Sequence, residues 1–290
     1  MSDKTSQRVY LNGQWLPLAE AKVSVLDRGF LFADGVYEVI PAYAGRPFRL
    51  AEHVERLDNS LRSIRMQPVM STEQWQDLLE QLIAEHNVGD LSIYLQVTRG
   101  ADEQRDHSIP QDIEPTVFAM AHPISSSLAD IAAKGIRAIT LDDIRWQWCQ
   151  IKSIALLGNV LLKDHASQQE AAEAILIRDG LATEGSASNL FVVKDQTLIT
   201  PPKSHHLLPG ITRDLVLELA QANNISCVEQ DIPASLLNDA DEIWLTSSTR
   251  EIMPVVELDG QVVSEGKPGP LWARLRQLYA DYKQTLRQTP

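Results

Sequence analysis

The feature that most constrains the fold is the alternation of strand-like and helix-like segments in the second half of the chain. From residue 136 onward, apolar strand-like runs at 136–141, 173–177 and 189–193 are interleaved with helical periodicity at 155–171 and 211–223. Some neighbouring strand-like runs are joined by turns too short for a crossover helix, such as Asp179-Gly180. The pattern predicts a mixed α/β sheet and argues against a purely parallel, doubly wound one.

The first 121 residues indicate a separate small α/β domain. Strands are expected at 9–15, 21–26, 37–43, 92–98 and 116–122, with a turn-rich stretch at 27–35. Two amphipathic helices are predicted from apolar residues at helical spacing, around 54–64 and 75–82. The segment 122–130 holds a proline and three serines without periodicity, which favours a linker. We therefore expect a small domain at 1–121 and a larger one at 131–290.

Charge and composition narrow the classes of partner. The net charge is −13 and the pI is about 5.0, which disfavours nucleic acid and anionic membranes because both are bound through clustered Lys and Arg. The N-terminal residues hold no apolar signal-peptide core, and no apolar run is long enough to span a bilayer. Cys149 and Cys227 show no metal-like spacing. We expect a cytoplasmic protein without a metal site.

The common mechanistic motifs are absent from the sequence. It holds no GxGxxG after a strand, no GxxxxGK[ST], no HExxH and no GxSxG. These absences argue against a Rossmann dehydrogenase, a P-loop enzyme and a zincin. The adjacent pair His205-His206 lacks a carboxylate or thiol in register and does not predict a metal site.

Two charged residues lie in unusual surroundings. Lys152 lies among apolar residues just before a predicted helix. Apolar surroundings disfavour the charged form of an amine, which suits a Schiff-base lysine, although a lysine stem can also pack on apolar surface with its head in water. Glu184 precedes the small residues 185–188, which let a ligand approach the backbone, although a solvated turn glutamate would look the same.

Two polar segments could bind an anion. Gly210-Ile211-Thr212 opens a predicted helix, whose free N–H groups and positive dipole end attract anions. The hydroxyl cluster 246–249 follows a predicted strand and could complete a phosphate site. Simple helix capping and a polar turn remain the alternatives for these two segments.

These features occur in an order that resembles the fold type IV pyridoxal-phosphate enzymes, a family of class IV aminotransferases and related lyases. The landmarks are DRGFLFADGVYEV, EHVERL, DIRWQWCQIKSIALLGNVL, EAILIRDGLATEGSASNLF, LLPGITRD and LTSSTREIMPV. The resemblance covers the chain nearly from end to end. It implies a two-domain α/β (α+β) fold with a small N-terminal domain and a larger, mixed-sheet, cofactor-binding domain, and it implies pyridoxal 5′-phosphate as the cofactor.

The resemblance also implies a role for each candidate residue. Lys152 would carry the cofactor and act as the acid and base, and Glu184 would pair with the pyridine nitrogen. The phosphate would be held by Arg56, Ile211, Thr212 and Ser248. The substrate pocket would include Tyr37, while Arg105 and His107 would bind the substrate α-carboxylate.

The pair Arg105-x-His107 resembles the D-amino acid aminotransferases within this family. Residues i and i+2 of an extended segment point to one side, so both cations can converge on one carboxylate. The resemblance implies a homodimer in which these two residues complete the neighbouring site, with transfer between a D-amino acid such as D-alanine and 2-oxoglutarate. A branched-chain L-amino acid aminotransferase and an aminodeoxychorismate lyase remain the alternatives.

Three positions depart from the family pattern. Pro41 stands in the predicted strand 37–43, where its missing N–H suggests an edge or a bulge. Ala187 interrupts the serine run after Glu184, and Ser248 stands where threonine is common. We expect these changes to alter affinity and substrate range while the chemistry is retained.

Overall fold

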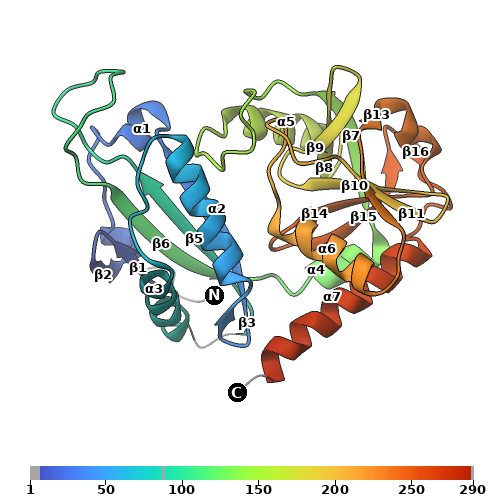
Figure 1. The fold of residues 1–290 in the computed structure, drawn as a ribbon, viewed down its shortest axis with the longest axis horizontal. Helices are drawn as coiled ribbons and strands as arrows, with labels where there is room; N and C mark the ends of the chain where they lie inside the picture. The colour runs from blue at the N-terminus through green and yellow to red at the C-terminus, as the bar shows by residue number, and fades with distance from the viewer. Residues whose placement is uncertain (1–6, 87–88, 289–290) are drawn as a thin grey trace. The chain divides into compact units, whose positions relative to one another are not determined.

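The computed structural model describes residues 7–86 and 89–288. It divides into two compact units (Figure 1). Unit 1 comprises residues 1–124 together with the short segment 151–155, and unit 2 comprises residues 125–150 and 156–290. The segment that holds Lys152 therefore belongs to unit 1, although the residues on both sides of it belong to unit 2.

Unit 1 is built on a six-stranded sheet in the described residues, in the order β2-β1-β6-β5-β3-β4, with antiparallel pairing throughout. Its strands are β1 (Arg8–Leu11), β2 (Gln14–Pro17), β3 (Gly35–Tyr43), β4 (Arg46–Pro47), β5 (Leu91–Thr98) and β6 (Thr116–Pro123). The central strands β5 and β6 alternate buried and partly buried residues, because one face lies on the core.

Helices cover one face of this sheet (Figure 1). They are α2 (Leu50–Ser63) and α3 (Thr72–Ala84), while the 3-10 turn η1 (Leu18–Glu20) and the short α1 (Arg28–Phe32) lie in the connections. A capping box formed by Ser71 and Gln74 starts α3. Leu57 and Leu61 of α2 and Trp75 and Leu79 of α3 are buried in one core with the strands, so the predicted amphipathic faces are the ones that pack.

Unit 2 contains a ten-stranded mixed sheet in the described residues. The order is β12-β11-β10-β14-β15-β7-β8-β9-β13, with β16 beside β15. The strands are β7 (Ile136–Asp142), β8 (Glu173–Arg178), β9 (Leu181–Gly185), β10 (Asn189–Lys194), β11 (Thr197–Thr200), β12 (Cys227–Glu229), β13 (Ile232–Pro233), β14 (Glu242–Ser247), β15 (Glu251–Leu258) and β16 (Gln261–Val262). Parallel pairs such as β7 with β8 occur in the same sheet as antiparallel pairs such as β10 with β14. The predicted mixed sheet is confirmed.

The helices of unit 2 pack on this sheet. They are α4 (Leu128–Lys134), α5 (Leu157–Gln168), α6 (Ile211–Ala222) and α7 (Pro270–Gln288), with the 3-10 segment η2 (Ala234–Asp239). Leu162 and Ala166 of α5 form an apolar cluster with Ala174 and Leu176 of β8. The helix α6 contacts both α7 and β14, which fixes the start of α6 relative to the sheet.

Several local predictions differ from the structure, and the single strand expected at 9–15 is a hairpin of β1 and β2. Residues 21–26 form no strand, because Lys22 to Leu26 are exposed and pair with no neighbour among the described residues. The expected turn at 27–35 contains the helix α1, whose N-cap is the Asp27 carboxylate. The segment 122–130 holds the end of β6, residues 124–127 and the beginning of α4, and its role as a linker stays a prediction. The strands β9 and β15 were not predicted, because only a short turn separates each of them from the strand before it.

Pro41 lies in β3, which pairs along its length with β5 but on its other side meets the two-residue β4. A missing N–H is tolerated there because little of that side is paired. The register between β3 and β5 runs without a shift. The strand β3 lies between β5 and β4, so the structure shows neither the expected edge position nor a bulge at Pro41.

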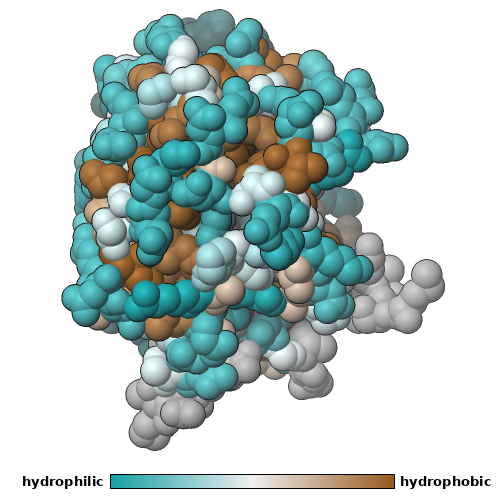
Figure 2. Space-filling model, turned by 90° about the vertical axis from the view of Figure 1, so that its right-hand side faces the viewer, coloured by the Kyte–Doolittle hydropathy of each residue, from teal (hydrophilic) through white to brown (hydrophobic). Residues whose placement is uncertain are grey.

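Hydrophilic side chains predominate on the face of the molecule shown in Figure 2, and apolar residues gather in patches between them. Within the described residues, no helix combines the length and the apolar character needed to cross a membrane.

Candidate active site

The backbone around Lys152 is joined to the first residues of β3. Tyr37 N–H donates to Lys152 O at 2.9 Å, and Ile154 N–H donates to Gly35 O at 3.0 Å. Lys152 N–H in turn donates to Ser60 Oγ on α2 at 3.2 Å. A Cβ at Gly35 would lie 2.7 Å from Val97 O, so only glycine allows this close approach. The lysine backbone is thus held from a strand and from a helix.

The half-buried side chain of Lys152 lies over an aromatic ring. Its Nζ is 4.1 Å from the centroid of the Tyr37 ring, a distance at which the ring face attracts a cation. Tyr37 stacks on Tyr94, with centroids 5.7 Å apart. Burial, together with Tyr37, raises the pKa of Tyr94 to about 12. Two of the predicted residues, Lys152 and Tyr37, are therefore in contact.

Arg56 lies on α2 in a buried ion pair with a residue that sequence reasoning missed. Its Nε and Nη2 donate to the two carboxylate oxygens of Glu38, each at 2.8 Å, and His53 Nδ1 lies 2.8 Å from Glu38 Oε2. Burial alone would raise the pKa of Glu38, but the charge and hydrogen bonds of Arg56 and the hydrogen bond of His53 hold it well below its usual range. Burial lowers the pKa of His53. Arg56 is thus fixed by an ionised carboxylate.

Arg105 and His107 lie in the exposed loop between β5 and β6. Both contact the ring of Phe32, with Arg105 Cζ at 4.9 Å from its centroid and the His107 ring centroid at 5.2 Å. The structure therefore brings both side chains onto one aromatic ring, and their binding of one carboxylate stays a prediction. Phe32 was not singled out from the sequence.

In unit 2, Glu184 is buried at the end of β9 with three polar partners. Arg145 Nη1 donates to its Oε1 at 2.5 Å, while Leu208 N–H and Asn189 Nδ2 donate to its Oε2 at 3.0 and 3.2 Å. Asp143 holds Arg145 through Nε and Nη2, both at 2.9 Å. Burial raises the pKa of Glu184, and Arg145 opposes that shift. Both carboxylate oxygens are therefore held by donors from the protein.

The start of α6 adjoins the same group. Gly210 is extended, and no described side chain caps this helix end, so the first N–H groups, including those of Ile211 and Thr212, lack intrahelical acceptors. A Cβ at Gly210 would lie 1.8 Å from Asn189 Oδ1, which shows how tightly the helix start packs against the residue that binds Glu184. Asn189 also pairs in register with Thr246 on β14.

These features of unit 2 fit an aromatic cofactor that carries a phosphate. Two buried hydroxyls, Ser188 Oγ and Thr246 Oγ1, have no hydrogen-bond partner among the described residues, and buried polar atoms in proteins are normally satisfied. Ser248, half-buried, follows two residues after Thr246. A helix N-terminus with hydroxyls suits a phosphate, and a buried carboxylate suits a protonated ring nitrogen.

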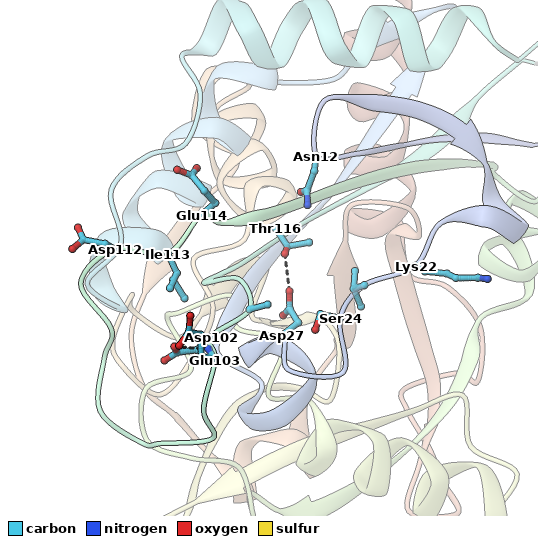
Figure 3. A pocket seen from close by; sticks show the side chains of 12 residues that line it. Asn12, Lys22, Ser24, Asp27, Asp102, Glu103, Asp112, Ile113, Glu114 and Thr116 are labelled. Carbon is cyan, nitrogen blue, oxygen red and sulfur yellow. Dashed lines mark hydrogen bonds between the residues drawn. The ribbon is translucent and has the colours of Figure 1, made fainter.

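A cavity of about 580 Å³ lies beside the loop that carries Arg105 (Figure 3). It is lined by Asp27, by Lys22 and by the loop residues Asp102, Glu103, Asp112 and Glu114. The excess of carboxylates gives it the wrong charge for a phosphate or an α-carboxylate. No cluster of metal-binding residues is found among the described residues. This cavity therefore does not fit the predicted phosphate or α-carboxylate.

Sequence reasoning missed Glu38, Arg145, Asn189 and Phe32. For Glu38 the sequence does hold a signal, because it shares the inward phase of β3 with the apolar Val36 and Ile40. Arg145 and Asn189 contact Glu184 across 39 and 5 residues of sequence, and such pairings become visible only in the fold.

Comparison with known proteins decides the family. The sequence model of the family described as amino-transferase class IV matches residues 35–258. The chain belongs to the class IV aminotransferases. It is 41% identical to a D-alanine aminotransferase of Listeria monocytogenes serotype 1/2a (strain 10403S) over 94% of this chain and 95% of that protein. It is 38% identical to a D-alanine aminotransferase of Staphylococcus haemolyticus over 95% and 97% of the two chains.

Solved structures of aminotransferases share the fold of this class IV aminotransferase. The branched-chain amino acid aminotransferase of Escherichia coli matches with a TM-score of 0.89 and 28% identity, over 95% of this chain and 94% of that one. The branched-chain aminotransferase of Thermoproteus uzoniensis matches with a TM-score of 0.88 and 27% identity, over 96% and 95%.

The resemblance, the mixed two-domain fold and the enzyme class predicted from the sequence are confirmed. As a class IV aminotransferase, the protein uses pyridoxal 5′-phosphate, which confirms the predicted cofactor. The roles assigned to individual residues and the domain limits stay predictions.

Proposed function

We propose that this aminotransferase transfers the amino group of a D-amino acid such as D-alanine to 2-oxoglutarate, giving pyruvate and D-glutamate in a ping-pong reaction. The observation that carries the proposal is the placement of Arg105 and His107 together on the Phe32 ring, in a chain 38 to 41% identical to D-alanine aminotransferases. A guanidinium and an imidazole two residues apart in one loop can both donate hydrogen bonds to a single α-carboxylate.

Lys152 and Glu184 have different proposed roles toward the cofactor. Pyridoxal phosphate, when bound, supplies a carbonyl carbon for the amino group and a ring that takes up electrons released at the substrate Cα. Lys152 Nζ holds the cofactor and moves the proton at Cα. Glu184 keeps the ring nitrogen protonated, and its contact with Arg145 holds the carboxylate in place.

The phosphate is assigned to groups that bind anions through geometry as well as charge. These are the Arg56 guanidinium, the N–H groups of Ile211 and Thr212, and the hydroxyls of Thr212 and Ser248. Glu38 orients Arg56 through two hydrogen bonds. Tyr37 lines the substrate pocket beside Lys152.

We further propose a homodimer in which Arg105 and His107 complete the site of the neighbouring subunit. A group of exposed apolar side chains in unit 2 supports this, namely Ile144, Trp146, Trp148, Leu157, Val160 and Leu161, with Leu157 72% and Trp148 56% exposed. Large exposed apolar side chains grouped in this way often belong to association surfaces. Both cysteines are free thiols, which fits the expected cytoplasmic location.

Two other activities compete with this proposal. The structural similarity to branched-chain aminotransferases of Escherichia coli and Thermoproteus uzoniensis favours an L-amino acid substrate. An aminodeoxychorismate lyase would use the same lysine and glutamate but would release pyruvate without an amino acceptor. The residues that bind the substrate carboxylate distinguish the branched-chain aminotransferase from the proposed enzyme. The need for an amino acceptor distinguishes the lyase from it.

Product analysis tests the proposed function. Purified enzyme given D-alanine and 2-oxoglutarate should form pyruvate and D-glutamate in equal amounts, and no pyruvate beyond one equivalent per site without the acceptor. L-Glutamate formed from L-leucine would favour the branched-chain activity, and acceptor-independent pyruvate from aminodeoxychorismate would favour the lyase. Arg105→Leu should weaken D-alanine use at least about tenfold, whereas Arg62→Leu on the exposed side of α2 should not.

A further inference from the structure

The loop between β5 and β6 needs an external support. Its residues 101–109 are almost all exposed and form no helix or strand beyond an isolated bridge at Ala101. A loop of this composition samples many conformations unless contacts restrict it. The positions of Arg105 and His107 therefore depend on what the rest of unit 1 provides.

The residues at the start of α1 bind both stems of this loop. Arg28 N–H donates to Gly100 O at 2.8 Å. Asp27 Oδ2 accepts hydrogen bonds from Thr98 Oγ1 at 3.0 Å and from Thr116 Oγ1 at 2.7 Å, the latter drawn in Figure 3. The two stems are thereby tied to one short helix.

Arg28 also binds the middle of the loop. Its Nη1 donates to Asp106 O at 2.7 Å, and Asp106 is the residue between Arg105 and His107. The Arg28 guanidinium lies 4.9 Å from the centroid of the Phe32 ring, the ring that Arg105 and His107 contact as well. A single buried arginine therefore fixes the main chain between the two cationic residues and shares their aromatic support.

Arg28 is itself held firmly. Its side chain is 4% exposed, and its Nε donates to Asp34 Oδ2 at 2.9 Å. Asp34 also accepts two hydrogen bonds from Arg99, at 2.7 and 2.9 Å. Burial would raise the pKa of Asp34, but hydrogen bonds from Arg99 and Arg28 lower it. The ionised carboxylate balances the buried charge of Arg28, so this arginine can act as a fixed anchor.

The charges of the loop show why an anchor matters. Asp102, Glu103, Asp112 and Glu114 line the cavity beside the loop (Figure 3), whereas Arg105 and His107 lie on Phe32. Asp102 and Glu103 are within three residues of Arg105. In a loose loop these carboxylates would compete with the substrate carboxylate for the arginine, because all are anions that pair with a guanidinium.

We propose that Arg28 is a positioning residue, which holds the loop so that Arg105 and His107 present their charges together to the substrate carboxylate. This rests on the proposed function of that pair. Arg28 acts through the carbonyl of Asp106 and through Phe32, and it touches neither substrate nor cofactor.

The first test compares Arg28→Leu, Arg28→Lys and Phe32→Leu with the wild type, in enzyme loaded with pyridoxal phosphate. In the half-reaction with D-alanine, the apparent dissociation constant should rise about tenfold in Arg28→Leu, with a smaller rise in Arg28→Lys. The limiting rate at saturation should stay within about twofold, because substrate binding is affected and the chemistry is not. Arg62→Leu serves as the matched control and should behave as the wild type.

Two further readouts separate positioning from general damage. Amide hydrogen exchange in peptides covering 101–110 should accelerate in Arg28→Leu, while exchange in α2 and α3 stays unchanged. In a background that carries both Arg105→Leu and His107→Leu, Arg28→Leu should weaken D-alanine binding no further, because Arg28 acts through these two residues. Additive losses, or unchanged loop exchange, would overturn the proposal.

The outcomes also distinguish a failure of this proposal from a failure of the proposed function of Arg105 and His107. If Arg105→Leu itself leaves D-alanine binding unchanged, the assignment of the carboxylate site fails and the purpose given to Arg28 fails with it. If Arg105→Leu weakens binding but Arg28→Leu and Phe32→Leu do not, the carboxylate site stands and Arg28 is not its positioning residue.

Discussion

At the scale of single residues, the buried partners of charged groups decide how the site is built. Glu38 is fully buried, yet it stays ionised because it accepts two hydrogen bonds from Arg56 and lies beside His53. A buried ion pair contributes modestly as a whole, but removing one partner leaves an uncompensated charge in the interior. The arginine assigned to the phosphate therefore depends on a residue that need not touch the phosphate.

Glu38→Gln tests this dependence. The substitution keeps the shape but removes the charge, so the free energy of unfolding should fall by about 3 kcal/mol, as measured by urea titration. Cofactor affinity should fall as well, since Arg56 loses its fixed orientation. Glu55→Gln, at an exposed position on the same helix as Arg56, should change neither quantity by a measurable amount. Unchanged stability in Glu38→Gln would contradict the role given to the pair.

The residues also show what could be predicted from sequence. Lys152 and Glu184 were singled out from the sequence as candidate site residues because a charged residue among apolar or small neighbours is unusual. The ordered, spaced motifs around them also identify a family. Arg145 and Asn189 were missed, since an arginine and an asparagine in polar loops carry no local sign of binding a distant carboxylate. Pairings across the sequence follow from the fold, so they could not be derived before it.

At the scale of elements, strong periodicity predicted well and short elements did not. The helices α2, α3, α5 and α6 were expected near their observed positions because apolar spacing over several turns is distinctive. The five-residue α1 was taken for a turn, because its stability comes from the Asp27 cap and from contacts with residues 98–116. The most consequential local element of unit 1 is thus one that sequence periodicity cannot reveal.

The position of the segment 151–155 could not be predicted from its local sequence either. Its sequence gives no strand signal, yet its hydrogen bonds to Gly35 and Tyr37 place the lysine backbone alongside β3. That pairing connects residues more than 110 positions apart. The backbone of Lys152, the proposed cofactor-binding lysine, is therefore positioned by long-range contacts.

At the scale of the whole molecule, the proposed homodimer can be tested by mixing two inactive variants. Arg105→Leu and Lys152→Ala homodimers should each be nearly inactive. A hybrid dimer should contain one intact site, because the first subunit supplies Lys152 and the second supplies Arg105. With random exchange, an equal mixture should recover roughly a quarter of wild-type activity. Native mass spectrometry would confirm the hybrids. Verified hybrids that remain inactive would contradict the sharing of sites between subunits.

The central claim is that this class IV aminotransferase works on D-amino acids, and the half-reaction tests it most directly. Enzyme loaded with pyridoxal phosphate is mixed with D-alanine or L-alanine, without an acceptor, and its absorbance spectrum is followed, with Lys152→Ala as the inactive control. The cofactor spectrum should change with D-alanine and stay constant with L-alanine. An equal response to both isomers, or a response to L-alanine alone, would contradict the claim.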